Sequence, residues 1–172
     1  DEVIVPANTY IGTWLAISRT GAQIIPVEPD EKSYNIDPNR ILQAITKKTK
    51  AILSVNLFGQ ACELDKVSRI AKKYNLSHIE DCAQSQGAKF KNKFAGTFGK
   101  FGCFSFYPTK ILGGYGDGGF ILTNDFKSFK QIKRIRFYGI ETIEKTKFKN
   151  KYYSNENGVN SRLDEIQSSI LN

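Results

Sequence analysis

The stretch EVIVPANTYIGTWLAISRTGAQIIPVEP, residues 2–29, decides the fold class. Residues 2–7 form an apolar run, which predicts a short buried strand. Residues 8–21 predict a helix that is capped by Asn8 or Thr9 and ended by Gly21. One face of this helix carries the larger apolar side chains, namely Tyr10, Trp14 and Ile17. Residues 22–29 predict a second strand, so the stretch is a strand–helix–strand unit.

The same alternation continues along the chain. Further strands are predicted at residues 51–59, 77–81, 102–108 and 118–124, and further helices at 36–49, 63–75, 125–139 and 161–172. A small hairpin is predicted at 88–96, turning at Lys91-Asn92. Repeated alternation of strand and helix indicates an α/β domain with a mostly parallel sheet between helices. The length of 172 residues suits one domain, residues 1–172.

Some local signals refine these boundaries. Pro38 fits the first turn of its helix, where a missing N–H costs nothing. Asp125 and Ser161 are expected near the starts of the last two helices, and Gly139 at an end. Residues 140–157 are polar and predict a long mobile loop. The first residue lies directly on a strand and the last inside a helix, so we expect the chain to be part of a longer protein.

Composition excludes several classes of protein. No apolar run approaches the roughly 20 residues that a membrane span needs, and the N-terminus has no signal-peptide pattern. Three widely spaced cysteines argue against a disulfide framework and for a cytoplasmic setting. A single histidine and the absence of a CxxC motif argue against a zinc site or another metal centre of His and Cys.

The formal net charge of +8 favours anionic ligands. Much of the positive charge falls between Lys127 and Lys151. The simplest interpretation is a solvated helix face and loop. A nucleic-acid-binding segment is the alternative, and it predicts steeply salt-dependent binding to DNA or RNA.

Candidate chemistry follows the ends of the strands, because parallel sheets bind ligands at their carboxyl edge. Asp81 and Lys110 each follow a strand. A lysine there can form a Schiff base with a carbonyl compound, and a carboxylate can hold a cationic ring nitrogen; pyridoxal phosphate (PLP) needs both. Ser105 and the glycines at 113–116 could cradle a phosphate, and Tyr10 could stack on a ring. Each residue also has an ordinary interpretation, as a surface lysine, a solvated acid, a turn glycine or a core aromatic.

Three segments carry a family resemblance. They are IEDCAQSQGA (79–88), GTFGKFGCFSFYPTKILGGYGDGGFILTN (96–124) and NSRLDEIQSSIL (160–171). In order and spacing they resemble the DegT/DnrJ/EryC1/StrS family of PLP-dependent nucleotide-sugar aminotransferases, over nearly the whole chain. The resemblance implies the large domain of the fold type I, aspartate aminotransferase-like PLP-dependent transferases. The family's N-terminal phosphate-binding segment and its C-terminal small domain have no counterpart in these 172 residues.

The resemblance also implies roles for individual residues. Lys110 matches the lysine that attaches PLP and moves the proton, and Asp81 matches the acid paired with the pyridine nitrogen. Gln84 matches the contact to the ring hydroxyl, Ser105 a phosphate ligand, and Tyr10 the aromatic that stacks on the ring. The resemblance also implies that the glycines after Lys110 let the backbone pass close beside the cofactor.

Oligomeric state and substrate are implied in the same way. Asn160 matches an asparagine that reaches the phosphate of the neighbouring subunit, which implies a homodimer with shared active sites. Lysine at position 110 favours transamination over the dehydration of family members that carry histidine there. Residues 5–18 are most similar to members that aminate C-3 of dTDP-linked keto-6-deoxy sugars, with glutamate as the expected donor. The alternatives are C-4 amination, and a non-catalytic regulator or scaffold that retains PLP; nucleic acid, membrane and metal are not expected.

Overall fold

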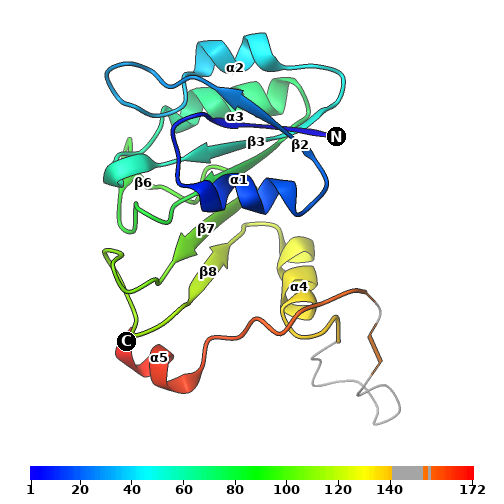
Figure 1. Ribbon diagram of the computed structural model, residues 1–172, viewed down its shortest axis with the longest axis vertical. Helices are drawn as coiled ribbons and strands as arrows, with labels where there is room; N and C mark the ends of the chain where they lie inside the picture. The colour runs from blue at the N-terminus through cyan, green and yellow to red at the C-terminus, as the bar shows by residue number, and fades with distance from the viewer. Residues whose placement is uncertain (141–152, 155) are drawn as a thin grey trace. The chain divides into compact units, whose positions relative to one another are not determined.

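The computed structural model describes residues 1–140, 153–154 and 156–172 (Figure 1). The chain divides into two compact units, Asp1–Leu122 and Thr123–Asn172. Residues 141–152 and 155 of the predicted mobile loop lie outside the described residues.

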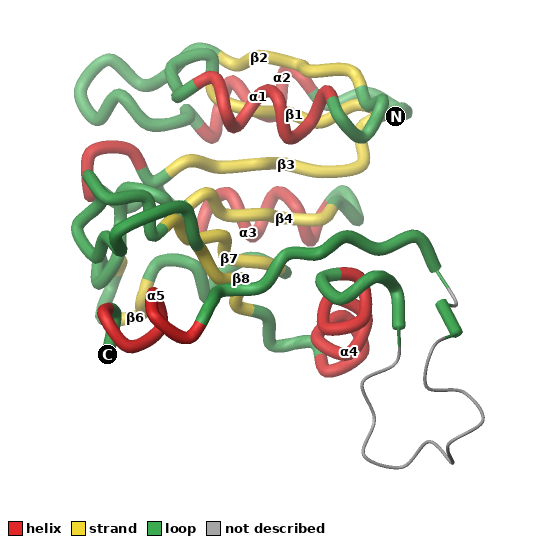
Figure 2. The backbone as a smooth tube through the Cα atoms, turned by 60° about the horizontal axis from the view of Figure 1, so that its bottom comes forward, coloured by secondary structure: helices red, strands yellow, loops and turns green. Residues whose placement is uncertain are grey.

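The first unit is built on a six-stranded sheet with the order β2-β1-β3-β4-β7-β8. The strands are β1 (Glu2–Pro6), β2 (Gln23–Val27), β3 (Thr49–Val55), β4 (Ser77–Asp81), β7 (Phe101–Ser105) and β8 (Gly119–Leu122). Neighbouring strands are parallel except β7 and β8, which are antiparallel. Figure 2 shows the strands stacked in this order. The predicted mostly parallel sheet is therefore confirmed.

Helices cover both faces of this sheet. The first face packs against α1 (Ile11–Ser18), where Val5 and Leu53 meet Ile17. The opposite face packs against α2 (Pro38–Ala44) and α3 (Leu64–Lys73), where Ile4 and Ile52 are completely buried. Successive residues of one strand thus enter different cores, as the two-residue repeat of a strand requires.

The observed N-caps of α1 and α2 can be compared with the predicted helix starts. Asp37 caps α2 by accepting the N–H of Asn39 at 2.8 Å, with Pro38 in the first turn as predicted. The prediction that Asn8 or Thr9 caps α1 is wrong. The N-cap is Tyr10, whose side chain makes no cap hydrogen bond, because the Thr9 hydroxyl is directed to the hydroxyl of Thr13 instead.

Of two further predictions, the strand at 51–59 is shorter than expected and the hairpin at 88–96 is confirmed. The strand predicted at 51–59 ends early: Leu57–Gly59 form a short 3₁₀ turn, η1, in which Phe58 has a positive φ of 56°. The predicted hairpin is confirmed as β5 (Lys89–Phe90) and β6 (Lys93–Phe94). Its turn residues Lys91 and Asn92 both have positive φ, the requirement of a type I′ turn.

The second unit contains α4 (Phe126–Ile135) and α5 (Glu165–Ile170). Asp125 caps α4 through the N–H groups of Lys127 and Ser128, and Gly139 follows the helix with a φ of 73°. The predicted cap at Ser161 is wrong, since Asp164 caps α5 through the N–H of Gln167 at 2.8 Å. A carboxylate at the start of a helix accepts the otherwise unpaired N–H groups there.

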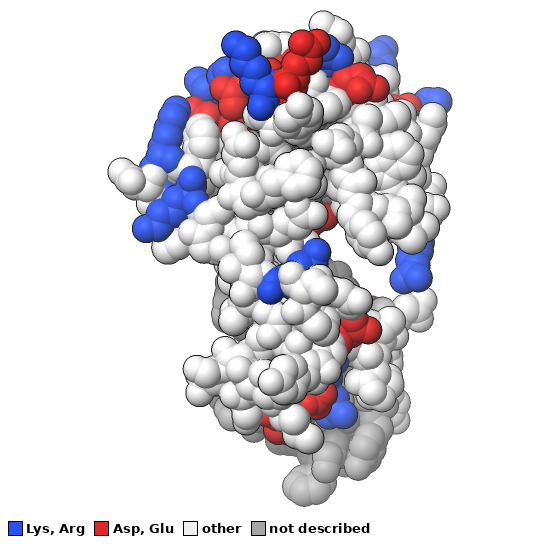
Figure 3. All heavy atoms as spheres, turned by 60° about the vertical axis from the view of Figure 1, so that its left-hand side comes forward, with Lys and Arg blue, Asp and Glu red and all other residues white. Residues whose placement is uncertain are grey.

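Charged side chains of both signs are visible on the first unit (Figure 3). Figure 3 shows Lys and Arg mixed with Asp and Glu at the top, where α2 and α3 lie in Figure 1. Of the Lys127–Lys151 segment, the part in α4 places Lys130 and Lys133 over the rings of Phe126 and Phe129. Within the described ranges, no helix has the length and apolar character that crossing a bilayer requires.

Candidate active site

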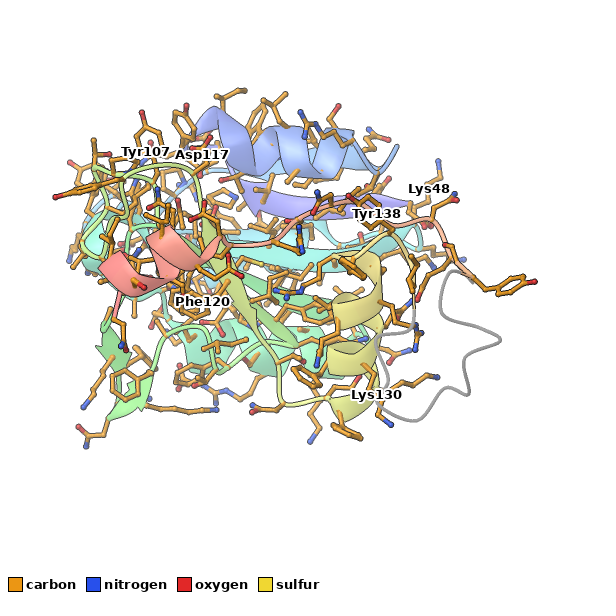
Figure 4. All side chains as sticks on the ribbon, turned by 90° about the horizontal axis from the view of Figure 1, so that it is seen from below. Lys48, Tyr107, Asp117, Phe120, Lys130 and Tyr138 are labelled. Atoms are coloured by element: carbon orange, nitrogen blue, oxygen red, sulfur yellow. The ribbon has the colours of Figure 1, made fainter. Side chains whose placement is uncertain are left out.

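The carboxyl ends of the parallel strands meet at one end of the sheet. Figure 4 shows Tyr107, just after β7, at the opposite end of the sheet from Lys48, just before β3. Val55 of β3, Asp81 of β4 and Cys103 of β7 are joined in register. The predicted site residues Asp81 and Ser105 therefore lie at the ends of neighbouring strands.

Strand alternation decides which face Asp81 occupies. His78 of β4 contacts Ser68 of α3 at 3.1 Å, and Cys82 belongs to the core on that side. Ile79 packs instead with the core beneath α1. Residues two apart in a strand project from the same face of the sheet, so the Asp81 carboxylate also faces α1.

The Asp81 carboxylate accepts one hydrogen bond on each oxygen. Oδ2 accepts the Thr13 hydroxyl at 2.8 Å, and Oδ1 accepts the N–H of Ala83 at 3.0 Å. The Asp81 carbonyl accepts the N–H of Asn56, which ties the end of β4 to β3. A carboxylate has about four acceptor sites. Asp81 is only half-buried, so it retains acceptor capacity for a cationic ligand group.

Gln84 is oriented by the 3₁₀ turn that follows β3. Its Oε1 accepts the N–H of Phe58 at 2.9 Å. Of the described residues, none accepts a hydrogen bond from the other end of this carboxamide. The Gln84 amide is therefore a fixed donor that can reach a ligand oxygen.

Ser105 lies on the same face of the sheet as Asp81. Phe104 packs into the opposite core, so Ser105 and Cys103 project to the α1 side. The Ser105 hydroxyl accepts a hydrogen bond from the backbone N–H of Tyr107 at 3.2 Å. The backbone carbonyl of Ser105 accepts a hydrogen bond from the side-chain NH₂ (Nε2) of Gln86 at 2.6 Å. The hydroxyl proton is thus still available to a phosphate oxygen.

Lys110 lies in the loop between β7 and β8. Its N–H donates to the carbonyl of Tyr107 at 2.9 Å, which closes a tight turn after the strand. The side chain is half-buried, and in the described part of the chain no acid pairs with its ammonium. This leaves the amine available for covalent chemistry.

The glycine-rich segment after Lys110 is hydrogen-bonded to the residue that follows β7. Phe106 accepts the N–H of Gly114 and donates its own N–H to the carbonyl of Gly118, both at 2.8 Å. A Cβ at Gly113 would lie 2.5 Å from the carbonyl oxygen of Pro108. The glycines allow close backbone passage, as the second interpretation of this run expects.

Tyr10 and Asn160 belong to different units of the chain. Tyr10, at the start of α1, is 72% exposed, whereas Ile17 of the same helix is buried and Trp14 packs against the core. An exposed ring remains available for stacking. Asn160 is exposed in the second unit, where it forms a β-bridge with Phe137.

Three polar residues around the site were not found from the sequence. Thr13 bonds to Asp81, and Gln86 bonds to the backbone of Ser105 while its Oε1 is buried without a partner among the described atoms. Glu80 is completely buried and accepts three backbone N–H groups. The signal for Thr13 was available: a polar residue on the inner side of a helix that directly follows a strand.

The remaining nucleophiles are held in their neutral forms. Burial raises the pKa of the Cys82 thiol to about 12 and that of Cys103 to about 11, with the nearby carboxylates adding to both shifts. Burial lowers the pKa of His78 to about 4. Thiols at neutral pH are poor nucleophiles and metal ligands. Across residues 1–140, 153–154 and 156–172, no group of three His, Cys, Asp or Glu side chains is placed to hold a metal ion.

The chain is similar to proteins that act on nucleotide sugars. It is 51% identical over 171 residues to the dTDP-3-amino-3,6-dideoxy-alpha-D-galactopyranose transaminase of Aneurinibacillus thermoaerophilus; the match covers 99% of this chain and 45% of the relative. DesV of S. venezuelae superposes with a TM-score of 0.91 at 41% identity, covering 99% of this chain and 44% of that one.

A second similar structure was solved with the cofactor bound. It is the E. coli GDP-4-keto-6-deoxy-D-mannose-3-dehydratase with bound hydrated PLP, with a TM-score of 0.90, 30% identity, and coverage of 99% of this chain and 46% of that one. The chain thus spans less than half the length of these proteins. Residues 1–172 match the DegT/DnrJ/EryC1/StrS aminotransferase family throughout. This chain therefore belongs to the DegT/DnrJ/EryC1/StrS aminotransferase family.

Proposed function

We propose that the protein is a PLP-dependent aminotransferase that converts a nucleotide-linked keto-6-deoxy sugar to its amino sugar. The observation that carries the proposal is the half-buried Asp81 carboxylate at the end of β4, oriented by two donors and still able to accept another. A protonated pyridine nitrogen is a ligand group that such a carboxylate would hold. Family membership and the names of the relatives support the reaction class.

The chemistry of the donor set fits PLP. Lys110 would attach the cofactor, Asp81 would pair with its ring nitrogen, and Gln84 would donate to its ring hydroxyl. The Ser105 hydroxyl would donate to its phosphate, and Tyr10 would stack on its ring. PLP, when bound, supplies an electron sink that stabilises the carbon losing its proton.

Lys110 has a second role in this proposal. The Lys110 amine would take the proton from the α-carbon of the amino donor and hold it for return. Such proton transfer by a positioned group contributes about 10²–10⁴-fold to rate. The Asp81 carboxylate would stabilise positive charge on the ring nitrogen.

The substrate and the assembly are parts of the same proposal. We expect a dTDP-linked sugar with a keto group at C-3, and glutamate as the donor, because the relative from A. thermoaerophilus is named for a 3-amino dTDP-sugar. Amination at C-4 is the alternative. We also expect a cytoplasmic homodimer in which Asn160 reaches the partner's cofactor phosphate, and a single large PLP-binding domain over residues 1–172.

The cofactor assignment is tested by trapping PLP on the full-length protein. Borohydride reduction followed by peptide mass spectrometry should find PLP on Lys110. Lys110→Ala should abolish the adduct. Lys100→Ala is the matched control, because Lys100 is an exposed lysine that directly precedes β7, whereas Lys110 lies in the loop that follows β7. A PLP adduct that persists in Lys110→Ala would contradict the assignment.

The reaction is tested by adding glutamate and then sugar. Glutamate should change the visible absorbance of the bound cofactor and release 2-oxoglutarate, and dTDP-linked 3-keto and 4-keto sugars should then be compared, with NMR of the product. An absorbance that glutamate leaves unchanged would favour the non-catalytic regulator.

A further inference from the structure

Asp81 is supported by two threonine hydroxyls in series. The Thr13 hydroxyl lies 2.8 Å from Oδ2 of Asp81, and the Thr9 hydroxyl lies 2.9 Å from that of Thr13. A hydroxyl has one proton to donate. If Thr13 gives its proton to the carboxylate, Thr9 must be the donor to Thr13. The two hydroxyls therefore point in one direction, toward Asp81.

We propose that Thr13, backed by Thr9, is a positioning residue that holds the Asp81 carboxylate in the orientation in which it meets the cofactor ring. Nothing in the family match or in the names of the relatives assigns a role to either threonine. The inference rests on the proposed function, since it assumes that Asp81 pairs with the ring nitrogen of PLP.

The two hydrogen bonds fix the orientation of the carboxylate. The Ala83 N–H can only donate, so Oδ1 must accept. The Thr13 hydroxyl is the donor to Oδ2. Because each oxygen is held by one donor, the plane of the carboxylate is set and its remaining lone pairs are left for a pyridine N–H.

The position of Thr13 explains why the contact is rigid. Thr13 is 6% exposed, in the first turn of α1, and the same helix packs Ile17 into the core. Threonine is restricted at χ1 because it is β-branched. The helix therefore fixes the position of the hydroxyl oxygen, and the hydrogen bond from this hydroxyl orients the carboxylate, so Thr13 acts through Asp81.

The test compares Thr13→Val with Thr13→Ser in the full-length protein. Valine keeps the shape and removes the hydroxyl, so PLP should bind about tenfold to hundredfold more weakly, the range expected for a lost hydrogen bond to a charged group. The absorbance spectrum of bound PLP should shift toward that of Asp81→Asn. Thr13→Ser should restore both affinity and spectrum.

The matched control is Thr49→Val. Thr49 is also a buried threonine, 5% exposed, whose hydroxyl lies 3.4 Å from a carboxylate oxygen of Glu2. It stands at the start of β3, at the amino end of the sheet. Thr49→Val should lower stability without changing PLP affinity or spectrum. If Thr13→Val and Thr49→Val behave alike, Thr13 is only structural and the inference is overturned.

A double-mutant cycle separates this inference from the proposed function. Because Thr13 acts through Asp81, Thr13→Val should have little further effect on PLP affinity in the Asp81→Asn background. If the wild type binds PLP and Asp81→Asn weakens binding, but Thr13→Val does not, the inference fails while the proposed function stands. If Asp81→Asn itself leaves PLP affinity unchanged, the role of Asp81 is wrong and the threonine inference falls with it.

Discussion

The end of β4 presents two adjacent carboxylates to opposite faces of the sheet. Glu80, on the α3 side, has no exposed surface and accepts the N–H groups of Gly96, Phe98 and Gly99 at 2.7 Å each. Asp81, on the α1 side, is half-buried and accepts one hydroxyl and one N–H.

The difference between the two acids lies in their donors. Glu80 is held by three backbone N–H groups, whose direction the chain fixes. Asp81 is held on one side by a hydroxyl, which can rotate and change from donor to acceptor. Glu80, held by backbone N–H groups, ties the Gly96–Gly99 loop to the sheet. Asp81, with a hydroxyl donor and unused acceptor sites, can bind a ligand. Replacing each acid by its amide tests this difference.

The largest effect should come from Glu80→Gln. One end of the glutamine side chain becomes an NH₂ group that must face a backbone N–H of the Gly96–Gly99 loop. We expect a loss of about 3 kcal/mol in the free energy of unfolding, since buried charged groups that lose hydrogen-bond partners cost this much. Urea denaturation of the full-length protein measures it.

Glu63→Gln is the control for this change. Glu63 is an exposed acid that forms a surface ion pair with Lys66, so the free energy of unfolding should change by less than about 1 kcal/mol in Glu63→Gln. Equal urea midpoints for Glu80→Gln and the wild type would show that the loop does not depend on the buried charge.

His78, on the same face as Glu80, predicts an acid-sensitive stability. Its imidazole lies between the hydroxyls of Ser54 at 2.8 Å and Ser68 at 3.1 Å, and burial lowers its pKa to about 4. The unfolded chain binds a proton near pH 6.5, so stability is present above that pH and falls as the pH drops toward 4. The loss should reach about 3 kcal/mol.

Replacement of the histidine isolates this effect. In His78→Gln, the change in unfolding free energy between pH 6.5 and pH 4 should be smaller than in the wild type. The acids whose pKa is lowered, such as Asp30 and Asp65, lose their contribution only below their ordinary pKa near 4. An unaltered slope above pH 4 in His78→Gln would contradict the assignment.

Much of the fold could be predicted from the sequence, because the signals are local. Alternating strands and helices, Pro38 in a first turn and the Lys91-Asn92 turn were all readable from residue type. The errors occur where a long-range contact competes with a local one. Thr9 is a good cap residue by type, but its hydroxyl serves Thr13, and η1 interrupts an apolar run that resembles strand.

The site was predictable to a lesser degree. The strand pattern predicted Asp81 and Lys110 near the carboxyl ends of strands, but only the fold shows that β4 and β7 are neighbours and that Asp81 and Ser105 lie on the same face. Thr13 stands 68 residues before Asp81 in the chain, so no local pattern connects them. Glu80 would be read from sequence as a solvated neighbour of Asp81, and only the path of the Gly96–Gly99 loop makes it a buried anchor.

The smallest effect on stability should come from Asp81→Asn, although it stands next to Glu80. The asparagine oxygen can still accept the N–H of Ala83, and the Thr13 hydroxyl can turn to accept from the new NH₂ group, with Thr9 turning in the same way. No hydrogen bond need be lost, so the free energy of unfolding should change by about 1 kcal/mol or less. PLP affinity should nevertheless fall by more than tenfold, because a neutral amide cannot balance a protonated ring nitrogen. Urea denaturation without PLP and a PLP titration, done on the same protein, measure both quantities. A large loss of stability with unchanged PLP affinity would reverse the roles assigned to the two acids.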